Sequence, residues 1–119
     1  MLVHVAMLNR SAVVVGPKQP FLDWLRALPN PVDEELTLDA LKVDRTVYLV
    51  PEWDTPEQFN AVLRECFDVI FEAELAGWWT EPSDWPSRRT FAIFKQWFDV
   101  ESHSVIEDLC EGLLIDDEV

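Results

Sequence analysis

The stretch Thr55-Pro-Glu-Gln-Phe-Asn-Ala-Val-Leu-Arg-Glu-Cys-Phe-Asp-Val-Ile70 carries the strongest structural signal in the chain. It opens with a threonine suited to a helix N-cap, a proline at the first helical position and a glutamine three residues after the cap, which together form a capping box. Apolar residues then recur at the three- and four-residue spacing of one helix face, and Gly77 offers a stop. The pattern predicts a helix over about 56–76, whose apolar face Phe71 and Leu75 widen enough to contact neighbours on two sides.

Two β-branched runs precede this helix and predict buried strands. Residues Ser11 to Gly16 contain Ala-Val-Val-Val and are closed by Gly16-Pro17. Thr46-Val-Tyr-Leu-Val50 is equally rich in strand-forming residues and is stopped by Pro51.

The segment between the two runs predicts a short helix, because its apolar residues share one helical face: Phe21, Trp24, Leu25 and Leu28. Pro29-Asn30-Pro31 should end that helix, since proline lacks the amide donor and disfavours helix in the residue before it. Residues Leu36 to Leu41 predict one more helical turn, capped by Thr37.

The last third of the chain is less regular. Trp78 to Pro86 is aromatic, acidic and proline-bearing, which predicts a loop held down by its own side chains. A third helix is predicted from the spacing of Phe91, Phe94, Trp97 and Phe98. For residues 98–110 the pattern is equally compatible with a helix and with a final strand. Beyond Lys95 there is no further Lys or Arg, so residues 111–119 are expected to form a solvated acidic tail.

The resulting order, β-α-β-α-α-β, predicts an α+β fold, or a small α/β one, with two layers in which helices cover one face of a short sheet. A chain of 119 residues has the common size of a single domain, so we expect residues 1–119 to share one core.

Composition narrows the classes of function. The chain has 23 Asp and Glu against 9 Lys and Arg, a formal charge of −14, yet it is 49% hydrophobic, so it should fold despite its charge. Nucleic acids and anionic membranes are bound chiefly through Lys and Arg, so we expect neither as a partner. No apolar run approaches the length of a membrane span, and residues 1–7 lack both the basic region and the length of a secretory leader, which predicts a cytoplasmic protein. Cys66 and Cys110 lie in apolar stretches and are expected to be reduced, buried thiols.

The motifs of common enzyme classes are missing from the sequence. Three glycines, at 16, 77 and 112, cannot build a phosphate-binding loop, and there is no G-x-S-x-G nucleophile elbow. His103 with Asp99 and Glu107 would gather a metal only if the segment were helical, and one histidine with two common acids is a weak signal. We therefore predict no metal, no cofactor and no catalytic residue.

Paired carboxylates are the most enzyme-like feature of the sequence. Glu52 and Asp54 flank Trp53, while Glu81 and Asp84 lie near two further tryptophans. Glycoside hydrolysis uses two carboxylates across a cleft, so a hydrolase is one hypothesis. With 23 acids in the chain, however, such pairs are common by chance.

A cluster of tryptophan and arginine is the leading candidate for a binding site: Trp78, Trp79, Trp85, Arg88 and Arg89. These residue types are enriched at binding hot spots, and an exposed cluster could also form a homodimer. The competing interpretation is structural: the tryptophans attach the loop to the core and the arginines pair with nearby acids.

Three segments resemble a family of small acidic bacterial proteins of unknown function. They are Arg10-Ser-Ala-Val-Val-Val-Gly-Pro-Lys-Gln-Pro-Phe-Leu-Asp-Trp-Leu25, Thr46-Val-Tyr-Leu-Val-Pro-Glu52, and Trp97-Phe-Asp-Val100 through Ile106-Glu-Asp-Leu109. The resemblance implies no activity and no catalytic residues. Similar sequences begin at Met7, which implies that residues 1–6 are an N-terminal extension and puts any strand there in doubt.

Taken together, these features predict a non-enzymatic module that binds another protein. An inhibitor, antitoxin or immunity-type protein that covers the basic site of its partner is the first alternative, because a large negative charge steers association with basic surfaces. The hydrolase is the second.

Overall fold

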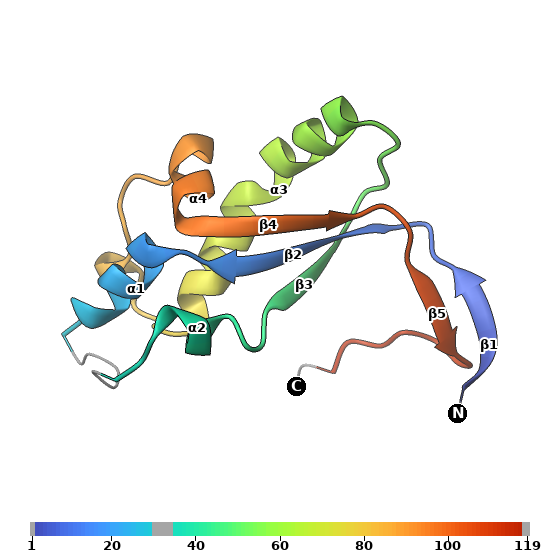
Figure 1. Cartoon of the computed structure of the whole chain (residues 1–119), viewed down its shortest axis with the longest axis horizontal. Coiled ribbons are helices and arrows are strands. Elements are labelled where there is room, and N and C mark those ends of the chain that lie inside the picture. The colour runs from blue at the N-terminus through green and yellow to red at the C-terminus, as the bar shows by residue number, and fades with distance from the viewer. Residues whose placement is uncertain (1, 30–34, 118–119) are drawn as a thin grey trace.

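A three-stranded antiparallel sheet carries the main helices on one face (Figure 1). The computed structural model describes residues 2–29 and 35–117. Its central strand, β2 (Ser11–Pro17), pairs on one side with β3 (Thr46–Val50) and on the other with β4 (Phe98–His103). Both predicted strands are therefore present, and the predicted α+β fold with two layers is confirmed.

The register of β2 decides which side chains meet the helices. Val13 lies opposite Tyr48 and Ser102, and Val15 lies opposite Thr46 and Val100. Directly paired residues point to the same face of an antiparallel sheet. Both valines are fully buried, so this inner face is the one that the helices cover.

The helices follow the sequence pattern closely. Helix α1 spans Gln19–Arg26, α2 Leu38–Leu41, α3 Pro56–Ala76 and α4 Phe91–Trp97, with a 3₁₀ turn, η1, at Pro82–Asp84. The capping box of α3 is formed: the Gln58 amide donates to Thr55 Oγ1 at 3.1 Å, and the Thr55 amide donates to Gln58 Oε1 at 3.3 Å. Gly77 ends α3 with right-handed backbone angles, so its left-handed freedom is not used there.

The two shorter predictions between β2 and β3 have different outcomes. The Thr37 side chain caps α2 as predicted, accepting a hydrogen bond from the Ala40 amide at 3.2 Å. Helix α1 already ends at Arg26, before the first proline of the predicted stop. Asn30 and Pro31 lie outside the described residues.

Aromatic rings fill the space between sheet and helices. Phe98 is the residue at which α4 passes directly into β4, and its ring centre lies 5.4 Å from that of Phe21, 5.2 Å from Phe71 and 5.3 Å from Phe94. All four side chains are at most 2% exposed. Helices α1, α3 and α4 are thereby held on one face of the sheet.

A second sheet of two strands forms an arm that extends away from this body (Figure 1). Strand β1 (Leu2–Met7) pairs antiparallel with β5 (Glu107–Cys110), and the two pack chiefly on each other. Residues 98–110 thus contain two strands and no helix. The predicted order of elements lacked β1, β5 and the short α2. The doubt about a strand in residues 1–6 was wrong, because Leu2–Met7 forms a strand that pairs with Glu107–Cys110 near the other end of the chain.

The arm also overturns the expectation for one cysteine. Cys66, on α3, is partly buried, and burial raises the pKa of its thiol. Cys110 is exposed, because it ends β5 where no helix covers the strand.

The capping box of α3 gives a direct test of this account. Thr55→Ala removes the side chain that accepts from the Gln58 amide, and we expect a loss of about 1 kcal/mol in the free energy of unfolding. Urea denaturation followed by circular dichroism measures it. Thr80→Ala, at an exposed threonine outside any helix, is the control and should change stability far less; equal losses would show that the cap does not stabilise α3.

Candidate functional site

Indole nitrogens hold the loop that follows α3 together and join it to helix α1. Trp79 Nε1 donates to Asp84 Oδ2 at 2.9 Å, and Trp85 Nε1 donates to the Trp79 carbonyl at 2.7 Å. From α1, Trp24 Nε1 donates to the Asp84 carbonyl at 2.9 Å. Both loop tryptophans are partly buried against the core, so the loop is held down by its own side chains, as the sequence predicts.

The arginines of the loop differ from each other. Arg89 donates to the Pro86 carbonyl at 2.7 Å and forms a 3.1 Å ion pair with Glu72 on α3. Arg88 is exposed and forms no ion pair with residues 2–29 or 35–117. Trp78 is 44% exposed. Three of the five candidate residues thus have structural partners, while Trp78 and Arg88 face solvent; the binding role of the cluster stays a prediction.

The paired carboxylates mostly serve local structure. Glu81 accepts from the Ser83 hydroxyl at 3.0 Å at the start of η1, and Asp84 is occupied by the Trp79 indole. Glu52 and Asp54 are exposed on either side of the buried Trp53. Glu81 and Asp84 are thus engaged in local contacts, and the hydrolase hypothesis stays a prediction.

His103 lies on a strand, so the helical spacing with Asp99 and Glu107 does not arise. Its Nε2 atom is 3.1 Å from Glu101 Oε2. Within residues 2–29 and 35–117 there is no group of three or more His, Cys, Asp or Glu side chains placed to hold a metal.

A cavity of about 370 Å³ lies between β3 and the C-terminal end of α3. Polar groups from both elements meet there: the Tyr48 hydroxyl donates to the Glu74 carboxylate, and Arg45 also lines the cavity. Burial raises the pKa of the Tyr48 phenol, and the hydrogen bond to Glu74 and its negative charge raise it further. Tyr48 therefore stays a neutral donor. Sequence reasoning missed this pair, because nothing in the local pattern relates residue 48 to residue 74.

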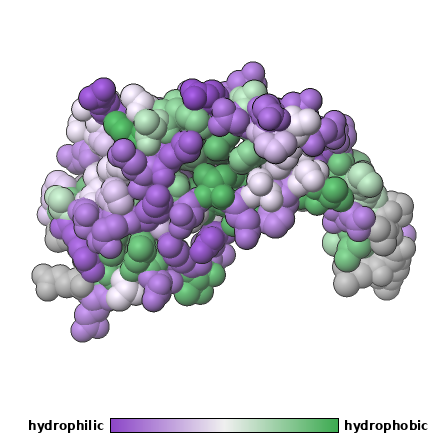
Figure 2. Space-filling model, turned by 45° about the horizontal axis from the view of Figure 1, so that its top comes forward, coloured by the Kyte–Doolittle hydropathy of each residue, from purple (hydrophilic) through white to green (hydrophobic). Residues whose placement is uncertain are grey.

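The arm and the segment after it expose the largest share of apolar surface. Residues 111–117 are here called the tail. The described part of the chain exposes eleven large apolar side chains, and six of them lie on the arm, in the bend before β5 or on the tail. These six are Met7, Val105, Leu109, Leu113, Leu114 and Ile115. A shallow hollow of about 560 Å³ lies between arm and tail, with Ala6, Leu8 and Leu114 among its walls. Figure 2 shows apolar side chains on the arm where it projects from the body.

The same region is strongly acidic. The arm and tail carry Glu107, Asp108, Glu111, Asp116 and Asp117, with no lysine or arginine after Lys95. Apolar and negative side chains are therefore interleaved on this surface. Among the described elements, β1 and β5 contact chiefly each other, and no helix packs extensively against them.

Comparison with known proteins does not assign the chain to a family. No protein-family model, curated protein or solved structure matches the chain. The resemblance to small acidic bacterial proteins stays a prediction. Among the described helices, none has the length and apolar character required to cross a membrane.

Tyr48 allows a pH prediction, since it is the single tyrosine of the chain. A phenol titrates near pH 10 when unfolded, and the folded pKa is higher, so the native state keeps a proton that the unfolded state loses. The stabilisation is complete below pH 10 and declines as pH rises above it. Near-ultraviolet absorbance of tyrosinate should show no step near pH 10 in the folded protein and a normal step in denaturant.

Two variants separate the causes of this shift. Glu74→Gln removes the negative charge and should lower the raised pKa, while Tyr48→Phe should abolish the absorbance step and reduce the loss of stability above pH 10. Circular dichroism establishes that the fold persists at each pH. Ionisation at the ordinary pKa in the folded protein would contradict the placement of Tyr48.

Proposed function

We propose that the protein is a non-enzymatic protein-binding module, and that its arm and tail dock onto a partner surface that is both apolar and basic. The observation that carries the proposal is the concentration of exposed apolar side chains on the most acidic part of the chain. Contiguous exposed apolar surface rimmed by charge is typical of interaction sites.

The architecture of the arm supports binding through it. A two-stranded sheet by itself is only marginally stable in water, because neither face has a core to pack against. Among the residues that the structure describes, each of its strands has one hydrogen-bonded neighbouring strand, which leaves the outward edges of β1 and β5 available for a further strand. A partner laid along the arm would satisfy those groups and cover Met7, Leu109 and Leu114.

Charge supports a basic partner over a second copy of the chain. Two arms brought together would place at least ten carboxylates, five from each copy, at one interface, whereas lysine and arginine on a partner would neutralise them. Masking a basic site, as an inhibitor, antitoxin or immunity-type protein does, is a specific form of this proposal.

Cys66 and Cys110 are both free thiols, which suits a reducing compartment such as the cytoplasm.

Peptides of defined sequence test the proposal without knowledge of the natural partner. We expect a short fluorescent peptide of alternating leucine and lysine to bind the full chain, measured by anisotropy, and to be released as ionic strength rises. Leu114→Ser should weaken binding about fivefold, because an apolar contact worth roughly 1 kcal/mol is lost.

The matched control is Val69→Ser on α3. Val69 is 66% exposed and Leu114 67% exposed, so both variants remove a similarly accessible apolar side chain. Val69→Ser should leave peptide binding unchanged. Equal weakening by both variants, binding of a leucine–glutamate peptide as tight as that of the leucine–lysine peptide, or binding insensitive to salt would each refute docking at the arm.

A further inference from the structure

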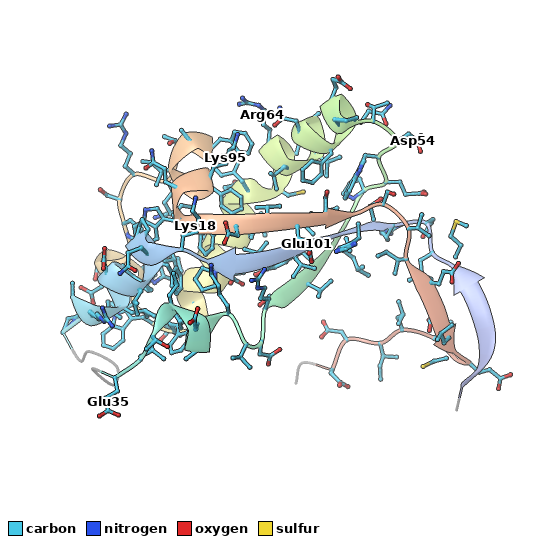
Figure 3. All side chains as sticks on the ribbon, in the orientation of Figure 1. Lys18, Glu35, Asp54, Arg64, Lys95 and Glu101 are labelled. Atoms are coloured by element: carbon cyan, nitrogen blue, oxygen red, sulfur yellow. The ribbon has the colours of Figure 1, made fainter. Side chains whose placement is uncertain are left out.

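Basic side chains gather on the body, away from the acidic arm (Figure 3). Lys18 precedes α1, Lys95 lies on α4 and Arg64 lies on α3, and the three are labelled in Figure 3. Lys18 and Lys95 line a hollow of about 300 Å³ between the first half of α3 and strand β4, here called the cationic hollow. Arg64 follows Leu63, which also lines it.

A hydrogen bond and a shared aromatic ring connect the three cations to one another. Lys18 Nζ donates to the Lys95 carbonyl at 3.1 Å. Lys95 Nζ lies 5.2 Å from the centre of the Phe91 ring, and Arg64 Cζ lies 4.5 Å from the centre of the same ring. Two positive charges thus share one aromatic side chain, an arrangement whose mutual repulsion a bound anion would relieve.

Carboxylates do not neutralise this group. Lys18, Arg64 and Lys95 form no ion pair with any residue in the described ranges. Asp99 lines the cationic hollow, but it is already paired with Lys42 at 3.1 Å. Two of the nine basic residues of a chain with charge −14 therefore line one hollow, whose single acid is already paired with a third, Lys42.

The rest of the wall is apolar. Phe59, Leu63, Phe98 and Val100 line the hollow, and Asn60 adds one amide at its edge. Ligand sites commonly combine an apolar wall with a few convergent polar groups, and volumes near 300 Å³ lie at the small end of their range. Each lysine ammonium has three donors, and Lys18 uses one of them on the Lys95 carbonyl.

We infer that the cationic hollow binds a small organic anion, with a carboxylate or phosphate monoester held by Lys18 and Lys95 and an apolar body packed against Phe59 and Leu63. A long polyanion does not fit this description, since the chain as a whole carries a formal charge of −14 and would repel its extension. The inference is independent of the docking proposed for the arm, which uses other residues and the opposite charge.

Phenyl phosphate and phenylacetate are suitable probes, with inorganic phosphate and benzyl alcohol as the headgroup-only and uncharged comparisons. Titrations of the full chain followed by amide nuclear magnetic resonance should move the signals of Asn60, Leu63 and Val100. We expect both aromatic anions to bind more tightly than inorganic phosphate or benzyl alcohol. The ratio of the dissociation constants of phenyl phosphate and phenylacetate reports whether the site prefers phosphate or carboxylate.

Lys95→Gln is the main variant, because the Lys95 ammonium forms no hydrogen bond with the described residues and its loss should not disturb the fold. It should weaken binding of the aromatic anions roughly three- to fivefold, the size of an exposed ion pair. Lys18→Gln provides a second, independent removal of charge. Arg88→Gln, which removes an exposed and unpaired cation elsewhere, is the matched control and should leave the affinity unchanged.

Several results would overturn the inference. Equal weakening by Arg88→Gln would indicate general charge attraction, and equal affinity for benzyl alcohol would indicate an apolar hollow without anion recognition. Signal changes confined to the arm, or no binding by either aromatic anion, would show that the cationic hollow is not an anion-binding site. Leu114→Ser should leave anion binding intact, so failure of this inference and failure of docking at the arm can be told apart.

Discussion

The position of Phe98 is the constraint on which the rest of the structure depends. Helix α4 passes into β4 at this residue without an intervening turn, and the ring contacts Phe21, Phe71 and Phe94 from three helices. Aromatic side chains bury large areas and add specific ring contacts, so one residue fixes both the direction of β4 and the face of the sheet that the helices cover. The central strand β2 is then enclosed between β3 and β4.

Outside this aromatic core the chain has little to hold it in place. The arm joins the two ends of the described sequence through backbone pairing, yet it lacks helices on either face, and Cys110 and Leu109 are exposed on it. Elements with few buried contacts open at lower free energy than the core. The molecule therefore combines a body organised by ring packing with an extension whose described large apolar side chains are exposed, and this contrast supports the proposal of a protein-binding function.

Charge is distributed as unevenly as burial. Acids dominate the arm and tail, whereas Lys18 and Lys95 line the cationic hollow on the body and Lys42 pairs with the Asp99 of its wall. A formal charge of −14 describes the chain as a whole and conceals this local excess of cations. The tryptophan and arginine cluster shows the reverse: its composition is typical of a binding hot spot, but Trp79, Trp85 and Arg89 are engaged in hydrogen bonds within the loop and with α3.

Sequence alone determined the elements whose signals are local. The capping box and apolar spacing set the bounds of α3, and the β-branched runs set β2 and β3, because propensity, capping and periodicity act over a few residues. Only the tertiary structure decided that Leu2 lies opposite Cys110, that Tyr48 donates to Glu74 and that Lys18 meets Lys95. Those contacts join positions 26 to 108 residues apart, and they depend on the path of the folded chain, which no short window of sequence contains.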